Sequence, residues 1–232
     1  MKQNKRTPRL TAFGAAAAVG ILMMGAETGS SRQAEQVRPQ QTQTAERAWQ
    51  AAPALSPASP SDPLAERLKR LRLPHEAIPT AEALARQADL IVFGHLQSQV
   101  SAYPAGARIG AGELYHYVQT IVVRTVLRGG GASAPSAVKL VTDGIEPLPP
   151  ASDPLNLTYT GPLAEGEYVF FLRRIPGTDL YALLNGWQAL YPVLDGKLIA
   201  LKQNGFAAYN DLTISGLQQK LRSSAAASPE NP

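Results

Sequence analysis

The side chains with the widest chemical range in this sequence are its three histidines, His75, His95 and His116. An imidazole titrates near neutral pH and can bind a metal ion. If a strand hairpin turns near residue 106, His95 faces His116 across it, close enough to share a ligand or a proton. A slip of one residue in register would separate the two rings, and two histidines without a third ligand make a weak metal site. We therefore interpret both as sheet residues of a candidate ligand surface and expect no metal.

Other patterns that support catalysis are missing from the sequence. Without cysteine, the chain has neither a thiol nucleophile nor a cysteine-bound metal. The run Gly129–Gly131 is not followed by the lysine and hydroxyl residue of a phosphate-binding loop. Asp143, Glu146 and Asp153 share a proline-rich stretch, but they lack the dense spacing of oxygen ligands in a calcium loop. We expect no catalytic residue, no cofactor and no enzymatic activity.

Aromatic side chains indicate a binding surface instead. Tyr115 and Tyr117 share one face of a predicted strand, and Trp187 directly follows an Asn-Gly pair. Together with the two sheet histidines they form a candidate surface for a protein or a glycan, although burial in a core explains strand aromatics equally well. A nucleic acid would also require a positive groove. Residues 80–222 contain 11 basic and 11 acidic side chains, so we expect no nucleic-acid partner.

The elements that would position these residues are mostly strands. Runs rich in Val, Ile, Tyr and Thr predict strands at residues 90–100, 115–127, 137–142, 167–173, 180–184, 189–194 and 197–201. Asp195-Gly196 is typical of a two-residue hairpin turn. Glycines and Pro104 predict a long loop between the first two strands, and residues 143–163, with five prolines, predict an extended loop without regular structure. The pattern indicates a mainly β fold, a curled barrel of five to six strands.

One helix is expected at each end of this body. Thr80 has the side chain of an N-cap for a helix that reaches Asp89. A last helix is predicted at residues 215–222, and residues 223–232, rich in Ala, Ser and Pro, are predicted to be a disordered tail.

The excess of basic residues lies at the start of the chain. The formal net charge is +4, and four basic residues without an acidic one precede the apolar run at residues 10–26. The rest of the chain has 18 basic and 18 acidic side chains. Residues 1–26 are therefore predicted to be a signal peptide, or an anchor if they are retained. We expect an extracytoplasmic protein that is secreted or tethered to the membrane through residues 10–26.

Residues 27–79 are predicted to be a disordered spacer, since Gln, Ala, Ser, Pro and Thr dominate most of it. It includes one short amphipathic helix at residues 63–73, which Asp62 would cap and in which leucines at spacings of four and three form a stripe. This helix could lie on an anionic membrane or a partner. The alternative, that its leucines pack on the folded body, is favoured because so short a helix needs tertiary support.

Four runs of strand and turn residues, at 88–94, 126–129, 138–142 and 162–172, resemble the netrin-like domain. That family includes the tissue inhibitors of metalloproteinases and is similar to uncharacterised secreted bacterial domains. The resemblance covers residues 80–222 and implies an oligonucleotide/oligosaccharide-binding-type (OB-like) barrel with flanking helices. The inhibitors chelate the metal of the protease through an N-terminal cysteine. Because this chain has none, the resemblance implies neither that mechanism nor any site residue.

Two functions from different classes follow from these observations. The first is an exported, non-catalytic OB-like module that binds a protein or a carbohydrate at the cell surface. The second is an extracytoplasmic regulator or inhibitor of an enzyme, with the loops at residues 102–112 and 143–163 as an inserting edge. A concave aromatic groove would favour the first function, and a rigid, exposed pair of loops would favour the second.

Overall fold

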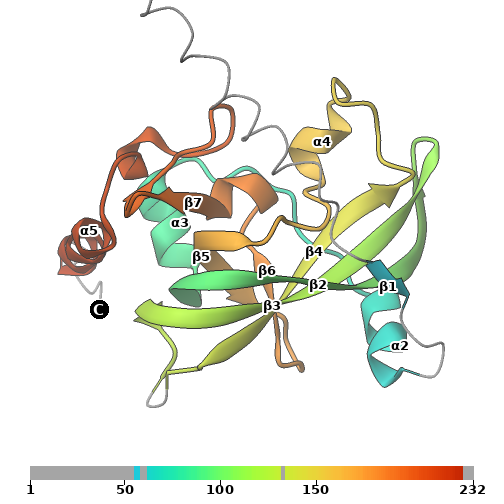
Figure 1. Cartoon of the computed structure of the whole chain (residues 1–232), viewed down its shortest axis with the longest axis horizontal. Helices are drawn as coiled ribbons and strands as arrows, with labels where there is room; N and C mark the ends of the chain where they lie inside the picture. Colours follow the sequence, from blue (N-terminus) through green and yellow to red (C-terminus); the bar gives the residue numbers. More distant parts are fainter. Residues whose placement is uncertain (1–54, 58–61, 132–133, 227–232) are drawn as a thin grey trace, which may run out of the picture. The chain divides into compact units, whose positions relative to one another are not determined.

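The computed structural model describes residues 55–57, 62–131 and 134–226 (Figure 1). The predicted signal or anchor at residues 1–26 lies outside the described residues, as do most of the predicted spacer and the end of the predicted tail. Among the helices of the described part, none combines the length and the apolar character that a membrane crossing requires.

The described chain is mainly β, which confirms that part of the predicted fold class. The strands are β1 (Leu55–Pro57), β2 (Leu90–Ile109), β3 (Gly112–Gly129), β4 (Ala137–Glu146), β5 (Gly166–Arg174), β6 (Leu180–Leu183), β7 (Leu190–Leu194) and β8 (Lys197–Leu198). The helices are α2 (Pro63–Lys69), α3 (Ala81–Gln87), α4 (Leu155–Thr158) and α5 (Ile214–Ala226), with short 3₁₀ turns η1 (Gly186–Ala189) and η2 (Ala207–Tyr209).

Five strands close into a ring. The order along the sheet is β1-β2-β3-β4-β6-β5-β7-β8, and β2 also pairs with β5. The pairings around the ring are antiparallel except for β4 with β6, which run parallel. The β2–β5 pairing uses only residues 90–96 of β2, so the rest of the β2–β3 hairpin extends beyond the ring (Figure 1).

The prediction of a loop at residues 102–112 is wrong. β2 continues to Ile109, which pairs with Gly112, so the connection is the two-residue turn Gly110-Ala111. The register shifts between Pro104 and Arg108, and Gly106, with φ +66°, lies in this irregular stretch. Proline and glycine here mark a bulge in a strand, a position at which both are tolerated, and not the end of the strand.

The predicted absence of regular structure at residues 143–163 is also wrong. β4 extends through Glu146, and α4 forms at Leu155–Thr158. The predicted positions of the later elements hold more closely: β5 differs from its prediction by one residue at each end, and α5 continues to Ala226, four residues further than predicted. Asp195 and Gly196, both with positive φ, form the predicted turn between β7 and β8.

The main hydrophobic core fills the ring and reaches under α3 and α5. Phe171, Tyr191 and Tyr209 contact one another there, with ring centroids 5.3 to 5.6 Å apart. The hydroxyl of Tyr209 donates to the carbonyl oxygen of Ala81, at 2.6 Å, and so joins η2 to α3. The Thr80 side chain accepts from the N–H of Ala83, as predicted for the cap of α3.

A second, smaller core lies under α2, outside the ring. Its buried residues are Leu68, Tyr103, Val141 and Leu180. Asp62 caps α2 as predicted, but the helix ends at Lys69 instead of residue 73. Its C-cap is Arg70, and the restriction that Pro74 places on the residue before it falls on Leu73, beyond the end of the helix. Leu68 is 1% exposed, so this part of the predicted spacer packs on the body, in line with the favoured alternative.

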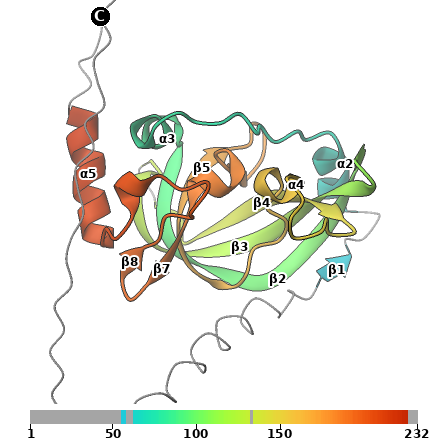
Figure 2. The ribbon, with the colours of Figure 1, turned by 90° about the horizontal axis from the view of Figure 1, so that it is seen from above.

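The two cores lie toward opposite ends of the sheet. In Figures 1 and 2, α5 lies beside one end of the strands and α2 beside the other. α4 lies at the α2 end in both views, close to the turn of the β2–β3 hairpin. The hairpin turn, α4 and α2 therefore belong to one end of the described body.

Candidate functional site

The five residues predicted to form a ligand surface do not form one surface. His95 pairs with Val122, and His116 pairs with Tyr103, so the predicted facing of the two histidines is wrong. The expected pairing assumed a turn near residue 106, whereas the turn lies at residues 110–111. A shift of this size moves every cross-strand neighbour.

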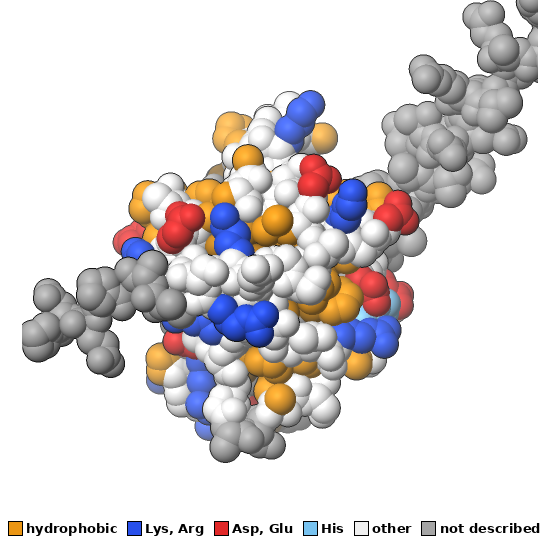
Figure 3. Space-filling view, turned by 90° about the vertical axis from the view of Figure 1, so that its left-hand side faces the viewer, with side chains coloured by type: hydrophobic (Ala, Val, Ile, Leu, Met, Phe, Trp, Pro, Cys, Tyr) orange, Lys and Arg blue, Asp and Glu red, His pale blue; other side chains and the backbone are white. Residues whose placement is uncertain are grey.

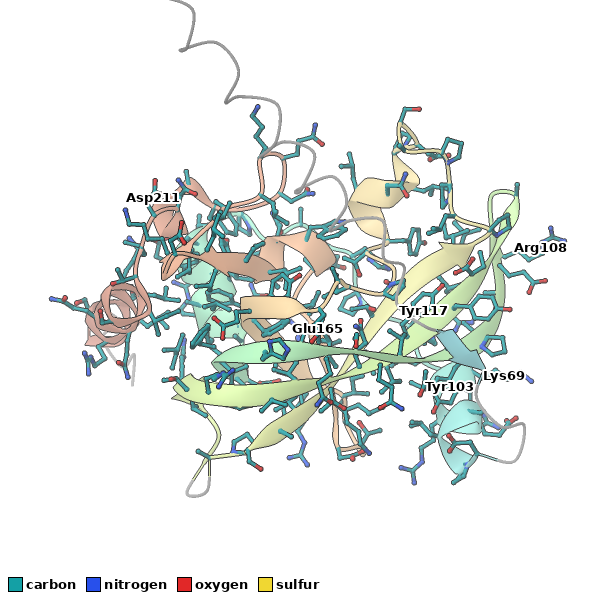
Figure 4. All side chains as sticks on the ribbon, in the orientation of Figure 1. Lys69, Tyr103, Arg108, Tyr117, Glu165 and Asp211 are labelled. Atoms are coloured by element: carbon teal, nitrogen blue, oxygen red, sulfur yellow. The ribbon has the colours of Figure 1, made fainter. Side chains whose placement is uncertain are left out.

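Each of the predicted aromatic residues contacts protein groups. Tyr117 is 0% exposed, and its hydroxyl donates to Oε1 of Glu146 at 2.7 Å; Figure 4 labels it on β3. Burial, and then this hydrogen bond, raise the pKa of the Tyr117 phenol. Tyr115 stacks on Tyr117 with ring centroids 6.4 Å apart. Trp187 is half-buried against the main core, and its Nε1 donates to the carbonyl oxygen of Asn156 at 2.9 Å. These side chains form no continuous aromatic platform.

His95 lies at the surface of the ring, with Nε2 3.2 Å from Oε1 of Glu165. Figure 4 shows Glu165 beside the part of β2 that belongs to the ring, far from Arg108 at the outer end of the hairpin. The His95 pair is therefore separate from both ends of the body.

Two exposed segments meet at the α4 end and form what we call the tip edge, residues 108–113 and 147–158. A Cβ added at Gly110 would lie 3.6 Å from Cδ1 of Leu155, which shows how closely the hairpin turn approaches α4. Leu148 and Leu157 on the second segment are 69% and 51% exposed. Arg108 and Glu113 add exposed charges of opposite sign from the hairpin.

Hydrogen bonds fix the longer segment of the tip edge. The carbonyl oxygen of Pro150 accepts from the N–H of Asp153 at 2.8 Å and from Nδ2 of Asn156 at 2.7 Å. Oδ1 of Asp153 accepts from the N–H of Leu155 at 2.9 Å. Trp187 holds the segment from below through Asn156. Since four prolines also lie in or at the ends of this stretch, little conformational freedom remains for a partner to remove.

A cluster of titratable groups lies beneath the chain that follows α2. Nε2 of His75 is 3.1 Å from Oδ2 of Asp143, a side chain that is 7% exposed. Asp143 is directly opposite His116 on the neighbouring strand. Within the described residues, no group of three or more His, Cys, Asp or Glu side chains is arranged to hold a metal ion. The His75–Asp143 pair was not predicted, because no local pattern links residues so far apart in sequence.

A groove of about 550 Å³ opens beside the start of α2. Oδ2 of Asp62 accepts from the hydroxyl of Tyr103 at 2.9 Å, and Nζ of Lys139 lies 3.1 Å from Oδ2 of Asp179. Arg67 also lines the groove. The three charged groups that already have partners have little need of hydrogen bonds from a ligand.

The face of the molecule at the α5 end shows a mixed charge distribution. In Figure 3, basic, acidic and apolar side chains are interspersed over the described residues of that face. No continuous basic tract crosses the described part of this face.

Comparison of the chain with protein-family models, with curated proteins and with solved structures gives no match.

Proposed function

We propose that this chain is an exported, non-catalytic module that binds a protein at the cell surface through its tip edge. Export is supported by the signal-like residues 1–26. Binding is supported by the exposed Leu157, which lies in the hydrogen-bonded part of the tip edge, and by the exposed Leu148, which lies between two prolines.

The observation that carries the proposal is this combination of exposure and order. A single exposed leucine is ordinary on a protein surface. An ordered loop differs because its side chains bind without the entropic cost of ordering the backbone first. Protein–protein interfaces have an apolar centre within a polar rim, and exposed leucines on an ordered loop suit such a centre.

A protein partner is favoured over a glycan by the aromatic residues. Sugar recognition in a barrel of this type would use an aromatic face and its adjoining loops. Tyr117 and Trp187 are instead engaged with Glu146 and Asn156. The exposed apolar area of the tip edge is aliphatic, which suits a hydrophobic pocket in a protein.

We further propose that the ring is an OB-like barrel of the netrin-like kind. In support, it has five strands, and the fifth of them along the chain, β6, lies between the third and the fourth. This return of a late strand between earlier ones gives the Greek-key closure of such barrels. A helix before the ring and one after it agree with the resemblance in sequence.

The second candidate is a regulator or inhibitor of an extracytoplasmic enzyme that acts through the same edge. The convergence of the hairpin turn and the loop at residues 147–158 favours it, because two adjoining segments can enter a cleft that one flat surface cannot. The inhibitory mechanism would differ from metal chelation by a cysteine, which this sequence lacks.

The test is binding that depends on the tip edge. The mature chain would carry a photo-crosslinking residue at position 157 or, as a control, at position 194, where Leu194 is 61% exposed on the β7–β8 hairpin. After irradiation in cell-envelope extract, we expect a protein adduct at position 157 that position 194 does not give. The double variant L148S/L157S should weaken capture of the same protein at least tenfold, and L194S should leave it unchanged.

Three other outcomes of the crosslinking and capture experiments would each contradict one part of the proposal. Equal capture by L148S/L157S and the wild type would refute the tip edge as the binding surface. Retention of a glycan without any protein would refute the protein partner. If the crosslinked protein is an enzyme and its activity falls on addition of the wild type but not of L148S/L157S, the second candidate replaces the first.

A further inference from the structure

The segment 62–79, which we call the strap, covers a row of polar side chains on the sheet. The strap consists of α2 and the chain that leads to α3. Beneath it, Tyr103 of β2 pairs directly with His116 of β3, which pairs directly with Asp143 of β4. Directly paired residues of antiparallel strands project from the same face. Figure 4 shows Tyr103 next to α2.

His116 is an unsatisfied buried group in this row. Its side chain is 0% exposed, and neither Nδ1 nor Nε2 has a hydrogen-bond partner among the described residues. The groups that face it are Asp143 from β4, Tyr103 from β2, and the backbone of Leu68 and Leu71 with Arg72 from the strap. Burial is the main influence on the ring and lowers the pKa of His116 below 6.5. The closed strap therefore favours the neutral ring.

His75 has the opposite preference. It belongs to the strap and reaches Asp143 on β4, while its ring lies edge-on to Tyr159 with centroids 5.0 Å apart. The hydrogen bond to Asp143 is the main influence and raises the pKa of His75 above 6.5, although burial acts against it. The closed strap therefore favours the protonated His75.

The two histidines limit the pH range in which the strap stays closed, His75 at high pH and His116 at low pH. A raised pKa contributes stability that is present below the ordinary value and is lost as the pH rises through the raised value. For a lowered histidine pKa, the open state takes up a proton as the pH falls through the ordinary value, and closure weakens. The Tyr103–Asp62 hydrogen bond is a constant tie, since the pKa of Tyr103 is raised to about 12 by burial and its hydroxyl remains protonated.

We propose that the strap is a clasp sensitive to pH, held over the sheet by the His75–Asp143 pair and released from below by the buried His116. Closure is most stable in mildly acidic to neutral solution and weakens on either side. This device concerns the α2 core and does not rest on the proposed partner. Its range of action is set by the ordinary titration of histidine.

Hydrogen exchange of the mature chain, followed by mass spectrometry between about pH 5 and pH 8.5, measures this opening. Rates are corrected for intrinsic exchange, so that protection factors of strap peptides report the opening equilibrium. For each unit by which a pKa differs between the closed and open states, protection should change about tenfold. Peptides of β5, which lie in the ring, serve as the internal reference.

Two variants distinguish the effect of His116 on strap protection at low pH from the effect of His75 at high pH. We expect H116L to remove the fall in strap protection at low pH and H75Q to remove the fall at high pH. H95Q is the matched control, because His95 pairs with Glu165 away from the strap, and it should retain both. If H116L does not fold, H75Q alone still tests the high-pH side.

Three results would overturn the clasp. One is strap protection that does not vary with pH after correction. Another is a profile in H75Q with both sides intact. The third is parallel loss of protection in the strap and β5, because opening would then be global unfolding. Loss confined to the strap, with each side removed by its own variant, supports the proposal.

Discussion

Replacement of Gln119 by leucine tests how the loop that precedes β5 is held to the ring. Gln119 on β3 is 2% exposed. Its Oε1 accepts from the N–H of Leu163 at 2.8 Å, and its Nε2 donates to the carbonyl oxygens of Leu163 at 2.9 Å and Gln97 at 3.3 Å. The side chain thus satisfies both backbone groups of a residue that is itself 3% exposed.

The magnitude follows from the groups left without partners. Leucine keeps the approximate volume but cannot form these bonds, so the N–H and C=O of Leu163 become buried and unsatisfied. Each such group costs about 1–3 kcal/mol, and the gain from an apolar side chain offsets part of the sum. We expect Q119L to lower the free energy of unfolding by about 3 kcal/mol. For a chain of this size, that lowers Tm by roughly 6–12 °C.

Urea denaturation followed by circular dichroism, together with thermal unfolding, measures the change. The control is Q99L, since Gln99 is exposed in the irregular part of β2 across from Gln119. A surface substitution of this kind should stay within about 0.5 kcal/mol of the wild type. A loss in Q119L of less than about 1 kcal/mol would refute the view that this hydrogen-bonding pattern anchors residue 163.

Two further substitutions test the ends of the ring and the second core. G129A should lower the free energy of unfolding by about 2 kcal/mol or more, because Gly129 has φ +80° and a Cβ would overlap the carbonyl oxygen of Asp89. G131A, also at positive φ but with open space around it, should cost only about 1 kcal/mol, and equal losses in urea denaturation would contradict the overlap. L68A should cost about 2–4 kcal/mol in the α2 core. In hydrogen exchange that loss should appear in α2 while β5 stays protected, and an unchanged α2 would contradict the packing.

Local chemistry explains what could be predicted from the sequence. The caps Asp62 and Thr80 and the turn Asp195-Gly196 depend on hydrogen bonds and dihedral angles within a few residues, and all three occur as expected. Strands with a continuous apolar run, such as β5, were placed to within one residue. In each case the interaction that determines the structure joins residues that are close together in the sequence.

The incorrect predictions concern segments whose structure depends on contacts between residues far apart in the sequence. Pro104 and Gly106 favour a loop by their local preferences, but pairing with β3 keeps them in a bulged strand. The shift in register separated His95 from His116, and no local signal could correct it. Asp143 and His75 are 68 positions apart and meet only because the strap crosses the sheet. The anchoring of Asn156 by Trp187 is likewise a tertiary contact that alternation and turn signals do not encode.

The β2–β3 hairpin is longer than the ring that it helps to close, and this separates the molecule into parts with different tolerance to sequence change. Residues 90–96 of β2 are bound on both sides by β3 and β5, whereas its outer half contacts the smaller core under α2. Substitutions in the inner half therefore affect closure of the whole ring. Those in the outer half act first on the smaller core, which joins the strap to Val141 of β4 and Leu180 of β6. A hairpin built in this way allows substitutions in the strap and the tip edge while the pairing of the ring that supports them stays the same.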